Sequence, residues 1–351
     1  MRLSPTILVI PSGIGCDIGG FAGDGIPVAK LLASASGCLI THPNVMNGGS
    51  LSDIDERIFY VEGYSLDKFA KGEIGLKRVN QQKIGIIFDC GIEKDLLVRH
   101  LQVADACIAT LGINIDSYVM TEESMNVVIE NQLHGISGGY IKNPSTLIKA
   151  GEKLIKRGIT AIAVVSKFPE EKNINELDLY REGKGIDPIA GAEAIISHII
   201  SKFFKIPCAH APALEPIQIK EDLDPRAAAE EIGYTFLPSV LRGLSKAPDL
   251  VDLSNSCERI TLSAQEVEFV VVPSGALGGE AVLACMERDI NVIAVKNKCI
   301  LNVDNKKINY PNILEVDNYF EAAGILLCAR EGINNKSFTR PLKSFKNSEI
   351  Y

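Results

Sequence analysis

The sequence predicts an α/β protein with a mainly parallel sheet, in which two similar Rossmann-like lobes enclose a cleft. Two observations lead to this prediction. Short apolar runs typical of buried strands alternate with helical patterns along most of the chain. A strand followed by Pro-Ser-Gly, paired glycines and a helix occurs twice, at residues 7–20 and again at 269–279. The 351 residues suffice for about two domains.

The first strand is the apolar run 7–10, and a helix with one apolar face is expected at 25–35. Asp24 is suited to cap that helix, and Pro27 is tolerated in its first turn. Since the next apolar run follows at once, this is a strand–helix–strand unit with parallel strands. The later strands are expected at 38–41, 58–61, 83–88, 118–121, 159–165, 206–209, 267–272 and 292–295. The later helices are expected at 93–104, 143–157, 187–203, from 224 to a break before Pro238, after residue 279, and at 318–330.

The charged stretch 166–186 is expected to connect the two lobes, because helical periodicity resumes only after it. The N-terminal lobe would then comprise residues 1–165 and the C-terminal lobe residues 187–333. The tail, 334–351, is polar and is expected to be mobile.

Composition excludes several classes of protein. The net charge of −8, from 36 basic and 44 acidic residues, gives no reason to expect nucleic acid as a partner. No apolar run is long enough to span a membrane, and the N-terminal run is too short for a signal peptide. The nine cysteines form no Cys-x-x-Cys, so we expect small buried hydrophobes in a reducing compartment. Cys16 lies inside the first glycine loop and is expected to be a passive thiol rather than an activated thiolate.

The two glycine loops follow strands and begin helices, so they are expected at the sheet edge where α/β proteins bind ligands. Glycine permits positive φ and close approach, and a helix N-terminus attracts an anion. The predicted ligand-binding residues here are Ser12, Gly13, Gly15, Gly19, Gly20, Asn44, Asn47, Ser274, Gly275, Gly278 and Gly279. The serines are read as donors, since neither lies in a Gly-x-Ser-x-Gly elbow. The alternative is that the glycines serve only tight strand–helix packing.

No nucleotide cofactor is indicated. A Walker pattern is absent, and His42 and Asn44 stand where a dinucleotide site would carry its ribose-binding acid. The sequence therefore leaves the cofactor and any metal open.

His42 and His210 are the candidate proton-transfer residues, because each follows a strand that begins near a cysteine. Ordinary half-buried histidines are the alternative. Asp17 and Asp89 lie near strand ends without an obvious capping role, so they are candidates to orient a substrate or a metal.

A second part of the site is expected where Asp187-Pro188 begins a helix. Gly191 and Glu193 lie in its first turn, and glycine within a helix costs about 1 kcal/mol relative to alanine. Such a cost is tolerated where a ligand or another backbone approaches closely. The helix start, His210 and the loop 274–279 are therefore predicted to border one cleft. Alternatively, Asp187 only caps the helix, Gly191 packs it against the sheet, and Glu193 is solvated.

Several motifs resemble a conserved family of unknown function found in cyanobacteria, plastids and other bacteria. The resemblance extends to about residue 330 and rests on residues 10–13, 41–44, 187–193, 209–212 and 273–279. It implies a cytoplasmic or plastid-stromal location and says nothing about chemistry.

The leading hypothesis is an enzyme that acts on a small anionic metabolite, phosphorylated or carboxylated, with histidine-assisted proton transfer. A metabolite-binding or sensing protein without turnover is the first alternative, and a structural or assembly factor is the second. Neither a nucleic-acid nor a membrane partner is expected, and the oligomeric state is left open.

Overall fold

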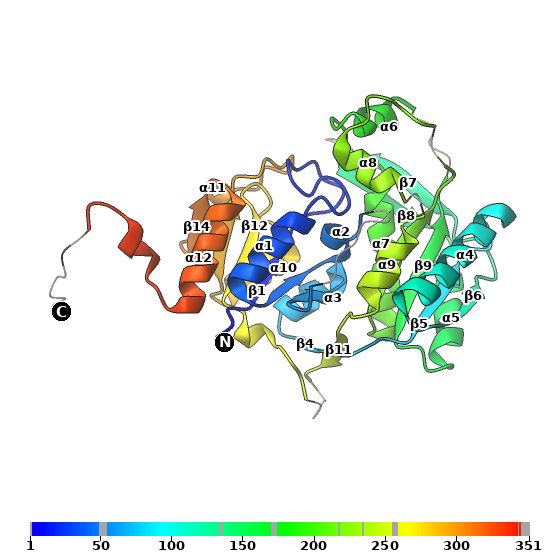
Figure 1. Ribbon diagram of the computed structural model, residues 1–351, viewed down its shortest axis with the longest axis horizontal. Coiled ribbons are helices and arrows are strands. Elements are labelled where there is room, and N and C mark those ends of the chain that lie inside the picture. The colour runs from blue at the N-terminus through cyan, green and yellow to red at the C-terminus, as the bar shows by residue number, and fades with distance from the viewer. Residues whose placement is uncertain are drawn as a thin grey trace.

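The computed structural model describes residues 2–48, 55–132, 136–169, 174–216, 218–233, 235–254, 259–342 and 344. Two parallel sheets lie side by side, each with helices on both faces (Figure 1). We call each sheet with its helices a lobe. The predicted α/β class with mainly parallel strands is confirmed.

The first lobe is built from both ends of the chain. Its strands are β1 (Thr6–Leu8), β2 (Leu39–Thr41), β3 (Ile58–Tyr60), β12 (Phe269–Pro273), β13 (Asn291–Val295) and β14 (Ile313–Val316). They lie in the order β14-β13-β12-β1-β2-β3, all parallel. One face is covered by α1 (Ile26–Ser36) and α12 (Tyr319–Glu331), the other by α3 (Gly63–Ala70) and α10 (Glu280–Glu287). Burial on both faces explains why these strands are continuous apolar runs.

The second lobe has strands β5 (Ile84–Phe88), β6 (Ile115–Met120), β9 (Ala161–Lys167) and β10 (Cys208–Ala213), in the parallel order β10-β9-β5-β6. Helices α4 (Lys94–Leu111) and α9 (Leu237–Leu244) cover one face, and α5 (Pro144–Ile155) and α7 (Ala190–Phe204) the other. A hairpin of β7 (Val127–Gln132) and β8 (Ile136–Ile141) packs against α7. The shorter elements are α2 (Pro43–Met46), α6 (Ile174–Arg181), α8 (Pro225–Glu231), α11 (Asn305–Ile308) and the 3₁₀ turns Ala264–Glu266 and Asn335–Phe338.

The chain crosses between the lobes twice, and the two crossings are tied together. β4 (Ile74–Lys77) and β11 (Asp249–Asp252) pair antiparallel beside them. The Gln82 side-chain amide donates to the Ala247 carbonyl and to Asp249 Oδ1, both at 2.9 Å. These bonds hold the two connecting segments in one arrangement.

The grouping of strands differs from the lobe limits predicted at 1–165 and 187–333. β12 lies directly beside β1, so the C-terminal third of the chain completes the first sheet. The predicted connection at 166–186 is wrong, because β9 before it and α7 after it both belong to the second lobe, and α6 lies within this range. As a result, the two Pro-Ser-Gly loops lie at one edge of a single sheet, with no such loop in the second lobe.

Two predicted helix caps are corrected. The residue before α1 is Gly25, which makes no side-chain cap, so Asp24 does not cap that helix. The residue before α7 is Ile189, whose N–H donates to Asp187 Oδ1 at 3.0 Å. Asp187 therefore organises the turn before the helix. Asp224 does cap α8, since its side chain accepts from the Arg226 N–H.

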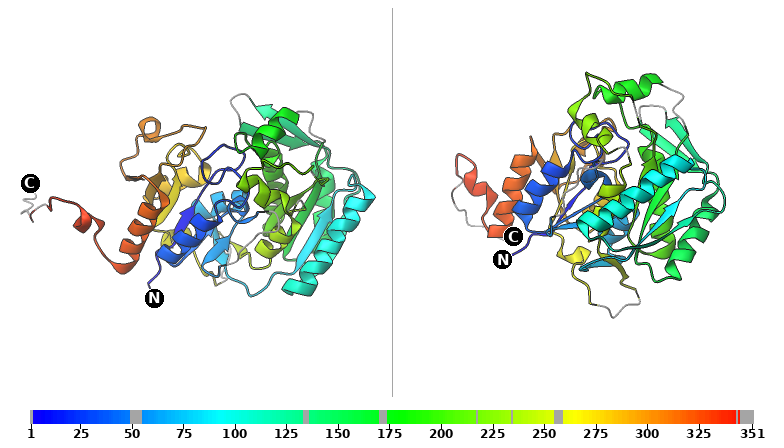
Figure 2. Two further views of the ribbon diagram at one scale, coloured as in Figure 1. Left: turned by 45° about the horizontal axis from the view of Figure 1, so that its top comes forward. Right: turned by 45° about the vertical axis from the view of Figure 1, so that its right-hand side comes forward.

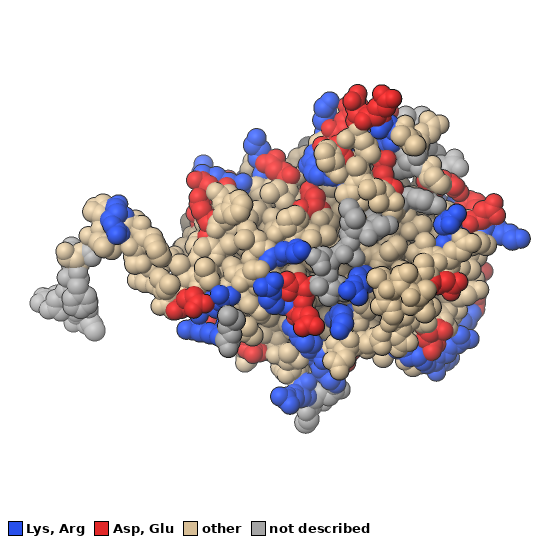
Figure 3. Space-filling view, viewed as in Figure 1, with Lys and Arg blue, Asp and Glu red and all other residues tan. Residues whose placement is uncertain are grey.

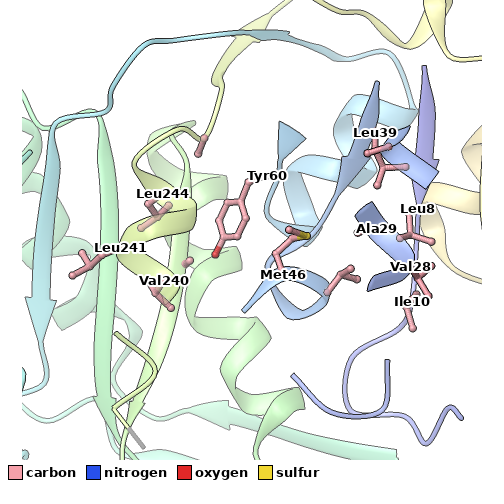
Figure 4. Close-up of a cluster of buried hydrophobic side chains, with 14 of the residues drawn as sticks. Leu8, Ile10, Val28, Ala29, Leu39, Met46, Tyr60, Val240, Leu241 and Leu244 are labelled. Carbon is pink, nitrogen blue, oxygen red and sulfur yellow. The ribbon is translucent and has the colours of Figure 1, made fainter. Parts of the chain in front are cut away.

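The two lobes share an apolar cluster, in which β3 and α2 of the first lobe pack near α9 of the second (Figure 4). Tyr60 of β3 faces Val240 and Leu244 of α9. A Cβ on Gly243 would lie 2.5 Å from the Tyr60 ring, so the absence of a side chain there allows the close contact.

The surface and the tail carry both charged and apolar side chains, with Phe338 and Leu342 of the tail exposed. On the face seen in Figure 3, Lys and Arg lie among Asp and Glu. The described residues after α12 are exposed, and this segment leads away from the lobes (Figure 2). Residues 343 and 345–351 of the tail lie outside the described residues.

Candidate functional site

A cavity of about 610 Å³ lies between the lobes, where the carboxyl ends of strands from both sheets meet. Its lining includes Ser12, His42, Asn44, Asn47 and Glu62 from the first lobe, and Lys167, Glu193, Ser197, His198 and His210 from the second. The size is typical of sites for small molecules, and strand carboxyl ends are where α/β proteins bind them.

His210 is held between a hydroxyl and a carboxylate. Its Nδ1 lies 3.1 Å from Ser197 Oγ, and its Nε2 lies 3.6 Å from Glu193 Oε2. β10 places His210 at the cavity, and the first two turns of α7 supply the other two side chains. The His210 side chain is 21% exposed, so a ligand can reach it.

Ser197 orients the ring of His210. The Ser197 hydroxyl donates its one proton to the Ala194 carbonyl at 3.2 Å, as expected for serine within a helix. In that arrangement the hydroxyl accepts from His210, with the ring proton on Nδ1 and the lone pair on Nε2, whereas a hydroxyl that donates to Nδ1 requires the opposite tautomer. Because Ser197 is itself buried, it orients the histidine and is not placed to act as a nucleophile.

His42 has a different state. Its Nε2 lies 3.3 Å from the Ile10 N–H and accepts from it, so in the neutral ring the proton is on Nδ1. Burial lowers the pKa of His42 to about 4, which keeps the ring neutral. His42 therefore offers a donor, because its only lone pair is already engaged.

His198 of α7 and Glu62, the residue before α3, form an ion pair between the lobes beside the cavity. The distance from His198 Nε2 to Glu62 Oε1 is 3.0 Å, and Glu62 Oε2 accepts from the Ser65 N–H. Although burial opposes it, Glu62 raises the pKa of His198 above its ordinary value of 6.5.

This ion pair predicts a pH dependence of stability. Since folding raises the pKa of His198, the pair stabilises fully below about pH 6.5, and this contribution is lost as pH rises through the folded pKa. The loss should be under about 1 kcal/mol because the side chain is 41% exposed. Urea unfolding at pH 6 and pH 8 measures it. Glu62→Gln, which keeps the cap on α3, should remove this part of the pH dependence, and an unchanged dependence would contradict the assignment.

A buried acid completes one wall of the cavity. The Tyr180 hydroxyl lies 2.8 Å from both carboxyl oxygens of Glu230, and the Ala22 N–H also donates to this carboxyl. Burial and the nearby Asp187 carboxylate raise the pKa of Glu230 well above its ordinary value. The group is therefore held toward its neutral form and ties the loop after β1 to α8.

The basic side chains of the lining, within the described part of the chain, have carboxylate partners. Lys167 pairs with Glu93, and Arg181 forms a two-point contact with Glu231 at 2.8 and 3.1 Å. His198 and His210 face Glu62 and Glu193, as described above. No group of three or more His, Cys, Asp or Glu among the described residues is arranged to hold a metal ion.

The structure brings together about a third of the predicted site residues. Those that line the cavity are Ser12, His42, Asn44, Asn47, Glu193 and His210. Those that do not are Asp17, Asp89, Gly13, Gly15, Gly19, Gly20, Gly191, Ser274, Gly275, Gly278 and Gly279. The start of α7, His210 and the loop 274–279 were predicted to line one cleft. The start of α7 and His210 line the cavity, but the loop does not.

The two aspartates outside the cavity have structural partners. Asp89 is fully buried, and its Oδ1 accepts from the Gly91 and Met125 N–H groups at 3.0 and 3.2 Å. Asp17 Oδ2 accepts from the Lys298 N–H at 3.2 Å. Both carboxylates hold loops, which explains why they lie at strand ends without facing the cavity.

Protein atoms fill the space beside most loop glycines. A Cβ on Gly13, whose φ is +66°, would lie 2.6 Å from Ser137 Oγ. A Cβ on Gly275 would lie 3.3 Å from Cys299. Close packing, the alternative interpretation of these loops, therefore accounts for both positions.

Gly191 allows a backbone rather than a ligand to approach α7. A Cβ there would lie 2.3 Å from the Ser137 carbonyl oxygen, and the Gly191 N–H donates to Ser137 Oγ at 2.7 Å.

We expect Gly191→Ala to destabilise the protein by about 1–3 kcal/mol, because β8 must move. Gly324→Ala, at an open position of α12, should instead stabilise it by about 0.5–1 kcal/mol. Urea unfolding compares them, and equal effects would contradict this role of Gly191.

Ser197, His198, Glu62, Tyr180 and Glu230 were missed by sequence reasoning. The first two point toward the cavity from a helix face shared with predicted residue Glu193, so helical spacing could have suggested them. No local signal marks the others.

Comparisons with known proteins identify a family without a known activity. The model of a family described as protein of unknown function (DUF3326) matches residues 5–339. An uncharacterized lipoprotein of Synechococcus sp. is 42% identical over 334 residues, which cover 95% of this chain and 92% of that protein. A 5-methylthioribose transporter solute binding protein from Thermotoga lettingae is 12% identical over 76% of this chain and 81% of that chain, with a TM-score of 0.17, too low to indicate a shared fold.

The description of the Synechococcus relative contradicts the cytoplasmic or plastid-stromal location predicted above, which is therefore corrected. A lipoprotein is held at a membrane by covalently attached lipid. Among the described residues, no helix combines the length and hydropathy needed to span a bilayer.

Proposed function

The chain belongs to this family of unknown function, and we propose from its cavity geometry that it is an enzyme acting on a small polar metabolite by proton transfer. The observation that carries the proposal is His210, whose ring is held by Ser197 and lies beside the Glu193 carboxylate at a reachable position in the cavity. With its proton on Nδ1, the ring offers the accessible lone pair that a general base needs. Glu193 would stabilise the imidazolium that forms after proton uptake.

The lining favours a ligand that is uncharged or cationic. Lys167, Arg181, His198 and His210 already face carboxylates. An anionic metabolite, expected from the glycine loops, would compete with these carboxylates for the same cations. A hydroxyl or amine instead matches the donor of His42, the imidazole of His210 and the side-chain amide of Asn44.

The test is a thermal-shift screen of the purified chain, followed by NMR of each stabilising compound incubated with the protein. Neutral polyols, sugars, nucleosides and amines form one panel, and phosphorylated and carboxylated metabolites form the other. We expect stabilisation and slow conversion within the first panel. Binding without conversion would support a sensing protein, and binding confined to the anions would contradict the ligand class.

A further inference from the structure

The loop after β1 and the loop after β13 meet at two cysteines. Cys16 and Cys299 face each other as an isolated antiparallel pair, and Figure 1 shows the two loops at the same end of the first lobe. The Asp17 N–H donates to the Lys298 carbonyl, and the Ile300 N–H donates to the Gly15 carbonyl, both at 3.1 Å.

These two hydrogen bonds define the geometry of the cysteine pair. They connect the residues on either side, so Cys16 and Cys299 themselves form the non-hydrogen-bonded kind of antiparallel pair. The Cα atoms of such pairs lie about 4.5 Å apart, and a disulfide needs about 4.4–6.8 Å. The backbone is therefore already arranged for a bond between the two sulfurs.

The two thiols differ in reactivity. Both are free, with Cys16 buried and Cys299 half-buried. A hydrogen bond between the thiols lowers the pKa of Cys299 and raises that of Cys16. Cys299 is thus the more accessible and more readily ionised sulfur, which suits the attacking thiol of an exchange reaction.

We propose that Cys16 and Cys299 are a redox-active dithiol that is oxidised to a disulfide by exchange with a low-molecular-weight disulfide. The Cys299 thiolate attacks the external disulfide, forms a mixed disulfide and releases one thiolate. The Cys16 thiol then loses its proton, attacks Cys299 Sγ and releases the second thiolate. The protein loses two electrons and two protons, and the external disulfide is reduced to two thiols.

The bond would act on the cavity through the first loop. Ser12 and Ala22 of this loop line the cavity, and Cys16 lies between them. Cys299 also packs against Gly275, in the Pro-Ser-Gly loop that follows β12. The loop after β1 forms one wall of the cavity. Oxidation would therefore fix this loop to the loop after β13.

The test uses the full chain with Cys90→Ser, which removes an exposed thiol elsewhere. The protein is incubated with oxidised glutathione at pH 8, digested and analysed by mass spectrometry. We expect a peptide pair linked through Cys16 and Cys299, reversed by dithiothreitol, and a melting temperature higher by roughly 5 °C in the oxidised form. Cys16→Ser in the same background should stop at a glutathione adduct on Cys299.

The proposal is overturned if the linked pair is absent while Cys90 of the unsubstituted chain is glutathionylated under the same conditions. It is also overturned if Cys299→Ser leaves the oxidation-dependent rise in melting temperature unchanged. Both readouts are independent of the proposed catalytic activity.

Discussion

Replacing His210 with Gln is expected to lower turnover by about 10²–10⁴-fold, the usual contribution of a general base. Glutamine fills similar space but has no lone pair of comparable basicity at the position of Nε2. Affinity should change only a few-fold, because the rest of the cavity lining is unaltered. Single-turnover rates and dissociation constants, measured on a compound from the thermal-shift screen, separate the two effects.

Ser197→Ala is the matched control for this substitution. It leaves the imidazole in place and removes the hydroxyl that holds its ring. We expect a smaller loss of turnover, with a shift in the pH–rate profile. Full turnover in His210→Gln would show that another group accepts the proton.

Tyr60→Ala is expected to lower the free energy of unfolding by about 3–5 kcal/mol. The ring fills the contact between β3 and α9, where the apolar cluster joins the two lobes (Figure 4). Its removal leaves a cavity that Gly243 cannot fill. Urea unfolding followed by circular dichroism measures the change.

Tyr60→Phe separates the ring from its hydroxyl. The Asn47 amide donates to the Tyr60 hydroxyl at 2.8 Å, so the phenylalanine variant should lose only about 1 kcal/mol. Equal losses in the two variants would mean that the hydroxyl contact, and not the packing between lobes, provides the stability.

Local patterns predicted the strands and helices better than they predicted the arrangement of the sheets. Apolar runs such as 83–88 and 267–272 are strands because burial on both faces requires an uninterrupted apolar sequence. The pairing of β1 with β12 depends on contacts between residues more than 250 positions apart, and nothing in either strand encodes its neighbour. For this reason the repeated Pro-Ser-Gly loops suggested two lobes, whereas they belong to one sheet.

The part of the site that could be predicted from the sequence lies near the carboxyl ends of parallel strands. His42 directly follows β2, as expected, whereas His210 lies within β10 rather than at its end, and both reach the cavity. The glycines gave a misleading signal, because the same lack of a side chain serves both ligand approach and close packing, as at Gly191 beside β8. Glu62 could not be found, since only the contact between the two lobes brings it to His198. Glu230 could not be found either, because it meets Tyr180 only where α8 packs against α6.

The most direct test of the central claim fills the cavity between the lobes. Ala194 lines the cavity, and Ala106 is exposed on α4 outside it, so Ala194→Trp and Ala106→Trp form a matched pair. Isothermal titration of each variant with the most stabilising compound of the screen measures binding. We predict that Ala106→Trp binds like the unsubstituted chain and that Ala194→Trp, still folded by circular dichroism, does not bind. Unchanged affinity in Ala194→Trp would place the ligand elsewhere and contradict the assignment of this cavity.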